Sequence, residues 1–292
     1  MIRFDGQTAI VTGAGKGIGR AYAQTLAARG AKVVVNNRRH PGETRSSADE
    51  VVEAIRAAGG QAVANYAAVD EDGAGEAMVA QALAEFGGLH ILMCNAGVGP
   101  RGMLHKQDEA LVRSTVDINV FGSLEPVRAA MPHLRAQGYG RALLTTSSAG
   151  IGGSLGFAVY GATKAAMHGF AASASLEADR FGVLINVISP SAFTNMTRWV
   201  AEVRGIDPAE REAETPVGPV AQVAAYMVSE AFDGRAEIWS VAGGHVDVVR
   251  LIRSRGVDVP PGELTAEKAA ELRDQIRDLS QAKVEELAFV KD

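Results

Sequence analysis

Residues 8–19 read Thr-Ala-Ile-Val-Thr-Gly-Ala-Gly-Lys-Gly-Ile-Gly, and this stretch decides the fold. Its apolar, β-branched start predicts a buried strand, and residues 17–29 predict an amphipathic helix. Gly13, Gly17 and Gly19 would let the backbone turn tightly and approach a pyrophosphate at the helix N-terminus, where free N–H groups favour an anion. A plain strand–helix turn can carry a similar glycine string, but its place between a strand and a helix favours dinucleotide binding.

The rest of the chain repeats the alternation of short β-branched runs and longer Ala-rich amphipathic segments. Strands are predicted at 8–12, 32–35, 62–65, 90–93, 141–146, 183–188 and 237–241, and helices near 17–29, 46–58, 71–86, 106–136, 158–180 and 219–230. Such alternation is typical of right-handed βαβ units. We therefore expect an α/β protein with a three-layer Rossmann fold and a doubly wound, seven-stranded parallel sheet.

The composition of the chain changes after Val241. Gly243-Gly244 and Pro260-Pro261-Gly262 bracket a connecting stretch, and a charged segment that predicts one helix over about 265–288 follows. We expect a dinucleotide-binding domain over 1–250 and a C-terminal helical extension over 251–292.

Composition also excludes several classes of protein. With 292 residues, 47% of them apolar, and a net charge of −5, the chain is expected to be globular and to have no nucleic-acid partner. No run of about 18 apolar residues predicts a membrane span, and the N-terminus lacks the apolar core of a signal peptide. A single cysteine, Cys94, fits a reducing compartment, so a cytoplasmic protein is expected. The six histidines show no metal-ligand spacing, so no metal site is expected: His40, His90, His105, His133, His168 and His245.

A proton-transfer site is predicted by Tyr160, Lys164 and Ser147. The tyrosine and lysine stand four residues apart, on one face of the predicted helix over 158–180, and the serine precedes the tyrosine by thirteen residues. A free tyrosine has a pKa of about 10, so its use near neutral pH requires a shift of about three units, which a nearby ammonium would favour. On an exposed helix the same pair would be merely solvated.

The end of the second predicted strand bears on the choice of cofactor. An NAD site usually places an acidic residue there, next to the ribose 2′-hydroxyl. Asn37 and Arg38 offer an amide and a cation instead, and Lys16 lies in the glycine-rich loop. This pattern favours a 2′-phosphate, hence NADP. NAD stays open, because Arg38 and Arg39 could be solvated turn residues.

Together, these motifs resemble the short-chain dehydrogenase/reductase family over about residues 4–250. Residues 12–19 are similar to its cofactor loop, residues 94–97 (Cys-Asn-Ala-Gly) to its Asn-Asn-Ala-Gly motif, and residues 119–122 (Asn-Val-Phe-Gly) to the motif of its catalytic asparagine. The resemblance implies four catalytic residues: Asn119, Ser147, Tyr160 and Lys164. It also implies these cofactor-binding residues: Gly13, Lys16, Gly17, Ile18, Gly19, Asn37, Arg38, Val69, Asn95, Ala96, Gly97, Tyr160, Lys164, Pro190 and Thr194.

Within this family the chain is similar to the dehydrogenase part of peroxisomal multifunctional β-oxidation enzymes, and to bacterial relatives that act on hydroxyacyl-CoA or steroids. The segments that carry this likeness are residues 4–6, 19–23, 33–36 and 62–66. The resemblance implies hydride transfer between NAD(P)(H) and a secondary alcohol or ketone, such as a hydroxyacyl-CoA, a steroid or another hydrophobic ketone. It further implies a substrate lid over 192–218, which holds Arg198, Trp199 and Arg204, and a homodimer or homotetramer formed through the helices at 106–136 and 158–180.

Four positions depart from the family pattern. Asn37 replaces the acidic residue of the subgroup, and Ala68, before Val69, stands where an aspartate near the adenine is common. Cys94 replaces the first asparagine of its motif, and Ser191 replaces the glycine after Pro190.

Two other functions remain open on the same fold. A nucleotide-sensing protein without turnover would have no need for all four catalytic residues. A lyase or epimerase relative would be expected to carry a larger C-terminal substrate domain.

Overall fold

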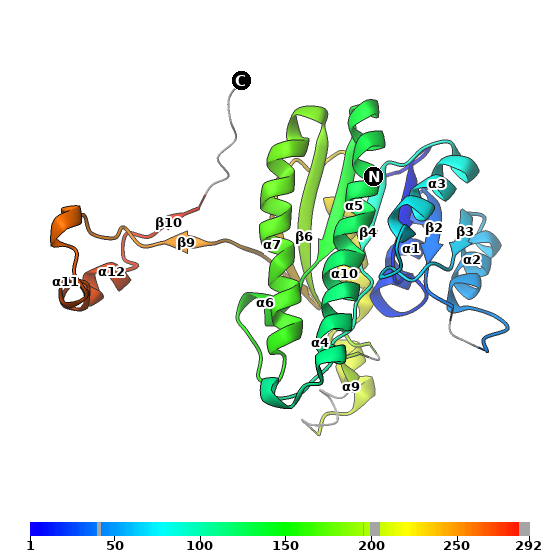
Figure 1. Ribbon diagram of the computed structural model, residues 1–292. Helices are drawn as coiled ribbons and strands as arrows, with labels where there is room; N and C mark the ends of the chain where they lie inside the picture. The colour runs from blue at the N-terminus through cyan, green and yellow to red at the C-terminus, as the bar shows by residue number, and fades with distance from the viewer. Residues whose placement is uncertain (40–41, 195, 199–204, 286–292) are drawn as a thin grey trace. The chain divides into compact units, whose positions relative to one another are not determined.

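The computed structural model describes residues 1–39, 42–194, 196–198 and 205–285. Their contacts divide the chain into two units, residues 1–247 and residues 248–292. The first unit is built on an eight-stranded sheet with the strand order β3-β2-β1-β4-β5-β6-β7-β8 (Figure 1). From β3 to β7 every pair of neighbours is parallel. The fold is therefore α/β, doubly wound and Rossmann-like, as the sequence predicts, with β8 added after the seventh parallel strand.

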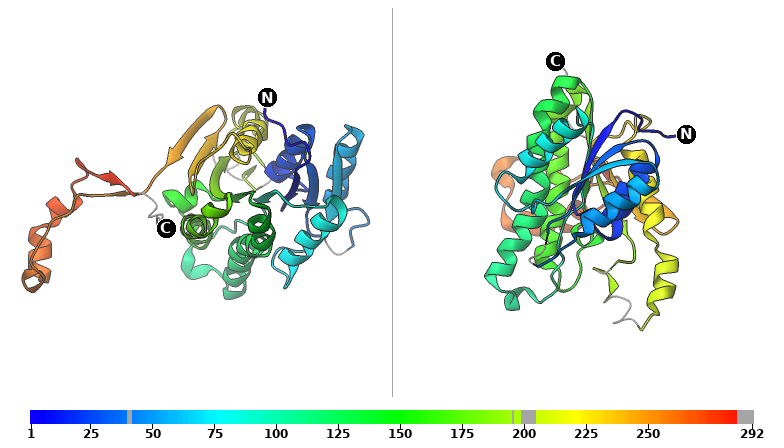
Figure 2. Two further views of the ribbon diagram at one scale, coloured as in Figure 1. Left: turned by 90° about the horizontal axis from the view of Figure 1, so that it is seen from above. Right: turned by 90° about the vertical axis from the view of Figure 1, so that its right-hand side faces the viewer.

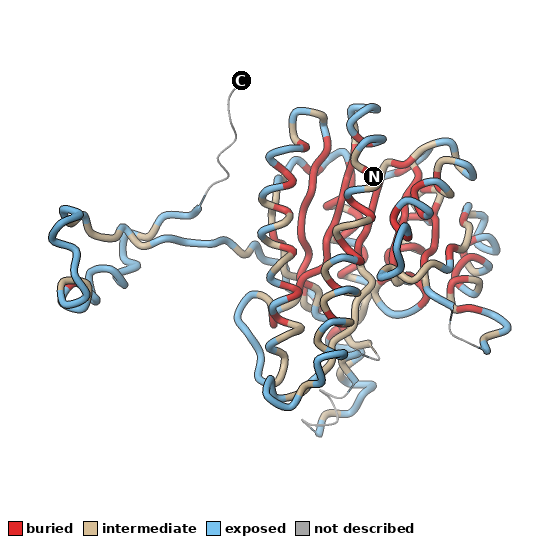
Figure 3. Tube along the Cα trace, viewed as in Figure 1, coloured by how far each residue is buried: buried red, intermediate tan, exposed pale blue. Residues whose placement is uncertain are grey.

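The strands of the sheet are mostly buried (Figure 3). They are β1 (Thr8–Val11), β2 (Lys32–Asn36), β3 (Gln61–Asn65), β4 (Ile91–Cys94), β5 (Gly140–Thr145), β6 (Val183–Ser191), β7 (Ile238–Ala242) and β8 (His245–Val249). β1, β4 and β5 are buried along their whole length. A parallel sheet that is covered on both faces needs apolar side chains on both, which explains the continuous apolar runs.

Two layers of helices cover the sheet (Figure 2). One layer holds α1 (Gly17–Ala28), α2 (Ser47–Ala57) and α10 (Val217–Met227), and the other holds α3 (Ala74–Phe86), α5 (Gly122–Gln137) and α7 (Ala158–Ala178). Shorter described segments of this unit are η1 (Leu104–Lys106), α4 (Glu109–Val116), the π-helical η2 (Asp117–Phe121), α6 (Ser148–Ile151), η3 (Asp179–Phe181) and α9 (Pro208–Glu214).

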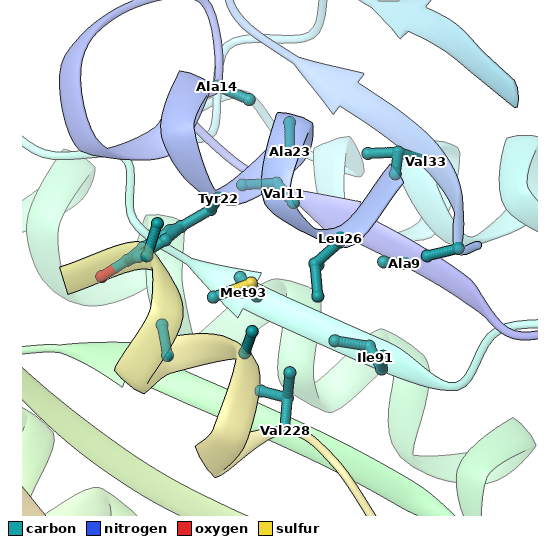
Figure 4. Packing of buried hydrophobic residues seen from close by; sticks show 14 of the residues in the cluster. Ala9, Val11, Ala14, Tyr22, Ala23, Leu26, Val33, Ile91, Met93 and Val228 are labelled. Carbon is teal, nitrogen blue, oxygen red and sulfur yellow. The ribbon is translucent and has the colours of Figure 1, made fainter. Parts of the chain in front are cut away.

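Helix α1 is held by the core between the sheet and α10 (Figure 4). Tyr22 and Leu26 of the helix, Val11 and Met93 of the sheet, and Val228 after α10 are each no more than 1% exposed. Full burial of one such side chain contributes about 1.5–3 kcal/mol. The core therefore fixes α1, and with it the glycine-rich turn that precedes it, against the end of β1.

The carboxyl ends of β1, β4 and β5 meet at one edge of the sheet. Val11 pairs with Met93, and Cys94 pairs with Leu144, so the residues that follow these strands are brought together. The strand order also reverses between β1 and β4, and ligands of such sheets bind outside the carboxyl ends at this point.

The predicted strands are confirmed, with boundaries that differ by one residue except in β6, which runs on to Ser191. The helix predicted near 106–136 is confirmed over 109–137, but it is not one regular α-helix. Asp108 caps α4 by accepting a hydrogen bond from the Ala110 N–H at 2.7 Å, and the π-helical turn at Asp117–Phe121 then separates α4 from α5. Such π-helical turns often lie at functional sites, and this one contains Asn119.

The second unit holds the antiparallel pair β9 (Ile252–Arg253) and β10 (Lys283–Val284), the turn η4 (Pro261–Glu263), and helices α11 (Ala266–Glu271) and α12 (Arg273–Arg277). The prediction of one helix over 265–288 is wrong over the described part, and residues 286–288 lie outside it. After Arg277 the Asp278 carboxylate accepts a hydrogen bond from the Ser280 N–H at 2.8 Å, which turns the chain. Within the described ranges no helix is long and apolar enough to cross a membrane.

Candidate active site

The glycine-rich turn and the loop after β4 pack backbone against backbone. A Cβ on Gly13 would lie 2.8 Å from the Ala96 Cα, and a Cβ on Gly19 would lie 2.3 Å from the Gly13 carbonyl oxygen. The Asn95 amide donates to the carbonyl oxygens of Thr12 and Gly13 at 3.1 and 3.2 Å. The Thr12 hydroxyl in turn accepts the backbone N–H groups of Asn95 and Ala96 at 3.0 and 3.1 Å. The predicted residues of these two motifs are thus brought together.

The N-terminus of α1 fits the pyrophosphate of a dinucleotide. Among the described residues no side chain caps it, and its first turn holds no acidic residue. Lys16 is the residue before the helix, and Gly17 has a φ of +55°, a left-handed conformation that favours glycine. A Cβ on Gly17 would come within 3.3 Å of the Thr194 side chain, so the segment after β6 closes the other side of the turn. Free N–H groups and the helix dipole therefore face a confined space that suits an anion.

Asn37, which follows β2, belongs to a small polar cluster. Its side-chain amide donates to the Ser47 hydroxyl at 3.0 Å and to the Arg38 carbonyl at 3.1 Å. A Cβ on Gly15 would collide with Ser47, so this hydroxyl lies against the glycine-rich loop. Sequence reasoning missed Ser47, since it lies ten residues after Asn37 and has no motif of its own.

Two neighbouring arginines differ in their contacts. The Arg39 guanidinium lies 4.2 Å from the centre of the Tyr66 ring and 3.7 Å from the Asp49 carboxylate. Arg38 is exposed, and among the described residues it has no ion pair. The Arg38 cation is therefore available to an anionic ligand at this end of the site.

Asn119, in the π-helical turn, is fully buried and ties three elements together. Its Oδ1 accepts from the Val98 N–H at 2.8 Å, and its Nδ2 donates to the Val98 carbonyl at 2.8 Å and to the Thr163 Oγ1 at 3.0 Å. A Cβ on Gly97 would lie 3.1 Å from the Asn119 Oδ1 and 3.3 Å from the Lys164 Nζ. Asn119 and Lys164 therefore flank the same glycine.

The Tyr160 phenol and the Ser147 hydroxyl lie close enough to influence each other. Burial raises the pKa of the Tyr160 phenol, and the hydrogen bond from Ser147 opposes that rise. The Ser147 hydroxyl also accepts from the Ala149 N–H at 3.2 Å, which begins helix α6. The edge of the Tyr160 ring contacts the Phe157 ring, with centroids 5.7 Å apart, which fixes the plane of the phenol.

Lys164 is 3% exposed, and its Nζ donates to the Thr145 carbonyl at 3.0 Å. Burial lowers the pKa of Lys164 to about 8. The sequence predicts that Lys164 lowers the pKa of Tyr160. In the structure the effect of burial is the larger one, and the pKa of Tyr160 is raised. The ammonium lies 5.9 Å from the centre of the phenol ring and is directed at Thr145, which explains the difference.

A contact between β5 and α7 lies behind these groups. The Thr146 hydroxyl donates to the Lys164 carbonyl at 2.8 Å, and its oxygen also lies 2.8 Å from the His168 Nε2. Because the single hydroxyl proton is already used, the imidazole must donate from Nε2. Burial lowers the pKa of His168. Sequence reasoning treated this histidine as scattered, since only the fold brings it to Thr146.

The remaining predicted residues have varied surroundings. The side chain of Ile18 packs on the hydrophobic core, and that of Val69 packs against Gly122 at the start of α5. Pro190 lies in β6, opposite Val241. The Thr194 N–H donates to the Thr197 hydroxyl at 2.8 Å. Trp199 and Arg204, predicted in the lid, lie outside the described residues.

Comparisons with known proteins agree with this geometry. The sequence model of the short chain dehydrogenase family matches residues 7–204. The chain is 39% identical to a protein of Mycobacterium tuberculosis assigned to the short-chain type dehydrogenases/reductases. The match covers 94% of this chain and 95% of that protein. It is 36% identical to the peroxisomal multifunctional enzyme type 2 of Drosophila melanogaster, over 97% of this chain but 47% of that enzyme. The chain thus spans about half the length of this larger relative.

Two solved structures of short-chain dehydrogenase relatives are similar to this chain. The full-length peroxisomal multifunctional enzyme type 2 from Drosophila melanogaster superimposes with a TM-score of 0.81 at 32% identity, over 97% of this chain and 47% of that one. A short chain dehydrogenase from Mycobacterium avium also gives a TM-score of 0.81, at 30% identity over 94% of this chain and 97% of that one.

Proposed function

The chain belongs to the short-chain dehydrogenase family and is an NAD(P)-dependent oxidoreductase, and from this we propose that it interconverts a secondary alcohol and a ketone with Tyr160 as the acid–base group. One observation carries the proposal. Tyr160 and Lys164 of α7, Ser147 before α6 and Asn119 of the π-helical turn gather around the ends of β4 and β5, beside a cradle that fits a dinucleotide.

Each of these side chains has a role that follows from its contacts. When bound, the nicotinamide supplies or accepts the hydride. In the direction of reduction the Tyr160 phenol donates its proton to the carbonyl oxygen, and the Ser147 hydroxyl hydrogen-bonds the same oxygen as it gains charge. Burial lowers the pKa of Lys164 to about 8, so its ammonium can return a proton toward the Tyr160 phenolate near neutral pH. Asn119 fixes the backbone at Val98 and so holds the floor of the site.

His168 is proposed to position this machinery through Thr146. The variant His168→Leu removes the donor to the Thr146 hydroxyl, next to Ser147. One hydrogen bond contributes about 0.5–1.5 kcal/mol, so we expect kcat to fall several-fold with little change in the KM for cofactor. The Ser147 contact lowers the pKa of Tyr160, so a looser contact should raise the pKa in the pH profile of alcohol oxidation. Stopped-flow or steady-state rates across pH measure both effects.

The matched control is His168→Gln, whose side-chain amide can donate in place of Nε2. It should restore most of the rate and the original pH profile. A His168→Leu profile identical to that of the wild type would leave His168 with a packing role only.

The preferred cofactor is proposed to be NADP(H). Arg38 and Lys16 offer cations, and Asn37 with Ser47 offers hydrogen bonds, where an NAD site would place a carboxylate. We expect NADPH to bind about 10-fold more tightly than NADH, as one charge-assisted hydrogen bond would give. Arg38→Asp should reverse the order. Arg45→Ala, which removes a cation paired with Glu53, should leave it unchanged. Fluorescence titration with both cofactors measures the ratio, and tighter NADH binding by the wild type would contradict the assignment.

We also propose a substrate class, an assembly and a compartment. A hydrophobic ketone or alcohol, such as a hydroxyacyl-CoA or a steroid, is supported by the exposed side chain of Met196, which lies near the Tyr160 ring across Gly99. The segment 192–218 is proposed as the substrate lid of a domain over 1–250. A homodimer or homotetramer through α5 and α7, in the cytoplasm, is the proposed state.

The decisive experiment mixes the purified protein with NADPH and a panel of ketones and follows the absorbance of the reduced nicotinamide. Oxidation of NADPH that depends on the ketone, together with a reverse reaction on the matching alcohol, is the expected result. Tight binding of NADPH without oxidation across a broad panel would favour a nucleotide-sensing protein instead.

A further inference from the structure

Gly99 lies between the phenol of Tyr160 and the side chain of Met196. A Cβ at this position would be 3.5 Å from the Met196 Sδ and 3.6 Å from the Tyr160 Cε2. Both are ordinary van der Waals distances, so the space next to the phenol edge has the size of about one methyl group.

The backbone does not explain why this residue is glycine. The φ of Gly99 lies outside the left-handed region that favours glycine, and Pro100 restricts the residue before it to extended conformations that Ala and Val adopt readily. What glycine provides here is the absence of a side chain.

The position of Gly99 is fixed by the active site itself. Its neighbour Val98 is held on both backbone atoms by the Asn119 side chain, at 2.8 Å each. Gly97, on the other side, lies against Asn119 and Lys164. The short segment 97–99 therefore runs from Asn119 and Lys164 to the edge of the Tyr160 phenol, where a substituent of the reacting carbon would lie.

The loop that holds Gly99 and the loop before α7 are joined, and both carry large apolar side chains. The Gly102 N–H donates to the Gly156 carbonyl at 2.9 Å, which joins the loop after β4 to the loop before α7. Met103 follows Gly102 and is 48% exposed, and Leu155 precedes Gly156 and is 79% exposed. Met196, in the segment after β6, is 46% exposed. Exposed apolar side chains that gather at a ligand site indicate an apolar ligand.

We propose that Gly99 determines the substrate specificity of the site. In this arrangement the smaller substituent of the reacting carbon occupies the slot between Gly99, Met196 and the edge of Tyr160, and an extended apolar group lies along Met103, Leu155 and Met196. The flexible thioether of Met196 adapts the slot to substituents of different shape. The substrate class is thus a ketone or secondary alcohol with one small and one long apolar substituent. This inference rests on the proposed function.

The test varies the slot and the substrate together. Wild type and Gly99→Ala are compared on two ketones with the same long alkyl chain, one with a methyl and one with a propyl group as the second substituent. In a hydrophobic pocket, the space of one methyl group changes kcat/KM by about 10- to 200-fold. We expect Gly99→Ala to lower kcat/KM for the propyl ketone at least 10-fold more than for the methyl ketone, and Gly99→Val to lower both.

Gly102→Ala is the matched control, because it makes the same change in the same loop. A Cβ there would meet only the flexible Gln107 side chain, at 3.4 Å, so the ratio between the two ketones should match that of the wild type. A Gly99→Ala variant that slows both ketones equally, or neither, would overturn the proposal.

Two further measurements separate this inference from the proposed function. The NADPH dissociation constant should be the same in all variants, since Gly99 faces the substrate side. If the wild type reduces no ketone, the proposed function fails; if it reduces ketones but Gly99→Ala leaves their ratio unchanged, only the inference fails. Methyl ketones with and without a CoA thioester at the far end of the chain then show whether the long apolar group belongs to an acyl-CoA or to a free lipophilic ketone.

Discussion

Replacing Tyr160 with Phe is expected to lower kcat by about 10²- to 10⁴-fold, the usual contribution of a positioned acid–base group. The substitution removes one oxygen and leaves the partly buried ring, which can keep its contact with Phe157. The proposed cofactor contacts at residues 12–19 and 95–97 are untouched, so the NADPH dissociation constant should change by less than about threefold, a shift well below 1 kcal/mol. Steady-state rates and fluorescence titration on the same preparation measure both quantities.

The rates of alcohol oxidation and ketone reduction should depend on pH in opposite directions. In the proposed mechanism alcohol oxidation needs the Tyr160 phenolate as base, and burial raises the pKa of Tyr160. Oxidation should therefore speed up as pH rises toward that raised pKa, and ketone reduction, which needs the protonated phenol, should slow above it. Both dependences should disappear from the residual activity of Tyr160→Phe.

Two adjacent serines supply the control. Ser147→Ala removes the hydroxyl that bonds the phenol and should slow turnover by about 10²- to 10³-fold, the range for loss of one donor to a developing oxyanion. Ser148→Ala alters an exposed neighbour and should have little effect. Turnover by Tyr160→Phe close to the wild-type rate would refute the assigned chemistry.

Local sequence signals were enough for much of this molecule. The glycine-rich turn at 13–19 was predictable because close backbone approach excludes any side chain, and this excludes every residue type but one. The strands were predictable because a parallel sheet buried on both faces needs uninterrupted apolar runs. Tyr160 and Lys164 were predictable as a pair on one face of a helix. Their electrostatics were not, since the pKa of Tyr160 depends on burial that no local pattern records.

The residues that were missed act through contacts between distant parts of the chain. His168 meets Thr146 across 22 residues, and Gly99 meets Met196 across almost a hundred. The interruption of the helix at Asn119 was missed for a related reason, because the bonds that accompany it go to Val98, 21 residues away. In the C-terminal unit the charged residues predicted a long helix, but only Leu272 of the helical region 266–277 is buried, so little packing supports one.

Gly19→Ala is expected to abolish tight binding of the cofactor. A Cβ here would lie 2.3 Å from the Gly13 carbonyl oxygen and 2.5 Å from the Asn95 Nδ2, so backbone or amide must move. The same amide donates to the carbonyls of Thr12 and Gly13. A displaced turn would move the N–H groups that are proposed to bind the pyrophosphate, and loss of two such bonds to the cofactor, at about 0.5–1.5 kcal/mol each, weakens binding by about 5- to 150-fold.

Thermal unfolding separates lost binding from lost folding. NADPH at 100 times its dissociation constant stabilises the wild type by about 2.7 kcal/mol, and Gly19→Ala should show almost none of this stabilisation while still unfolding cooperatively. Gly218→Ala is the matched control, since a Cβ at this exposed position of α10 meets nothing within 4 Å. It should keep the full NADPH-dependent shift in Tm. If Gly19→Ala kept that shift as well, the space between the turn and the loop after β4 could not be the cradle of the pyrophosphate.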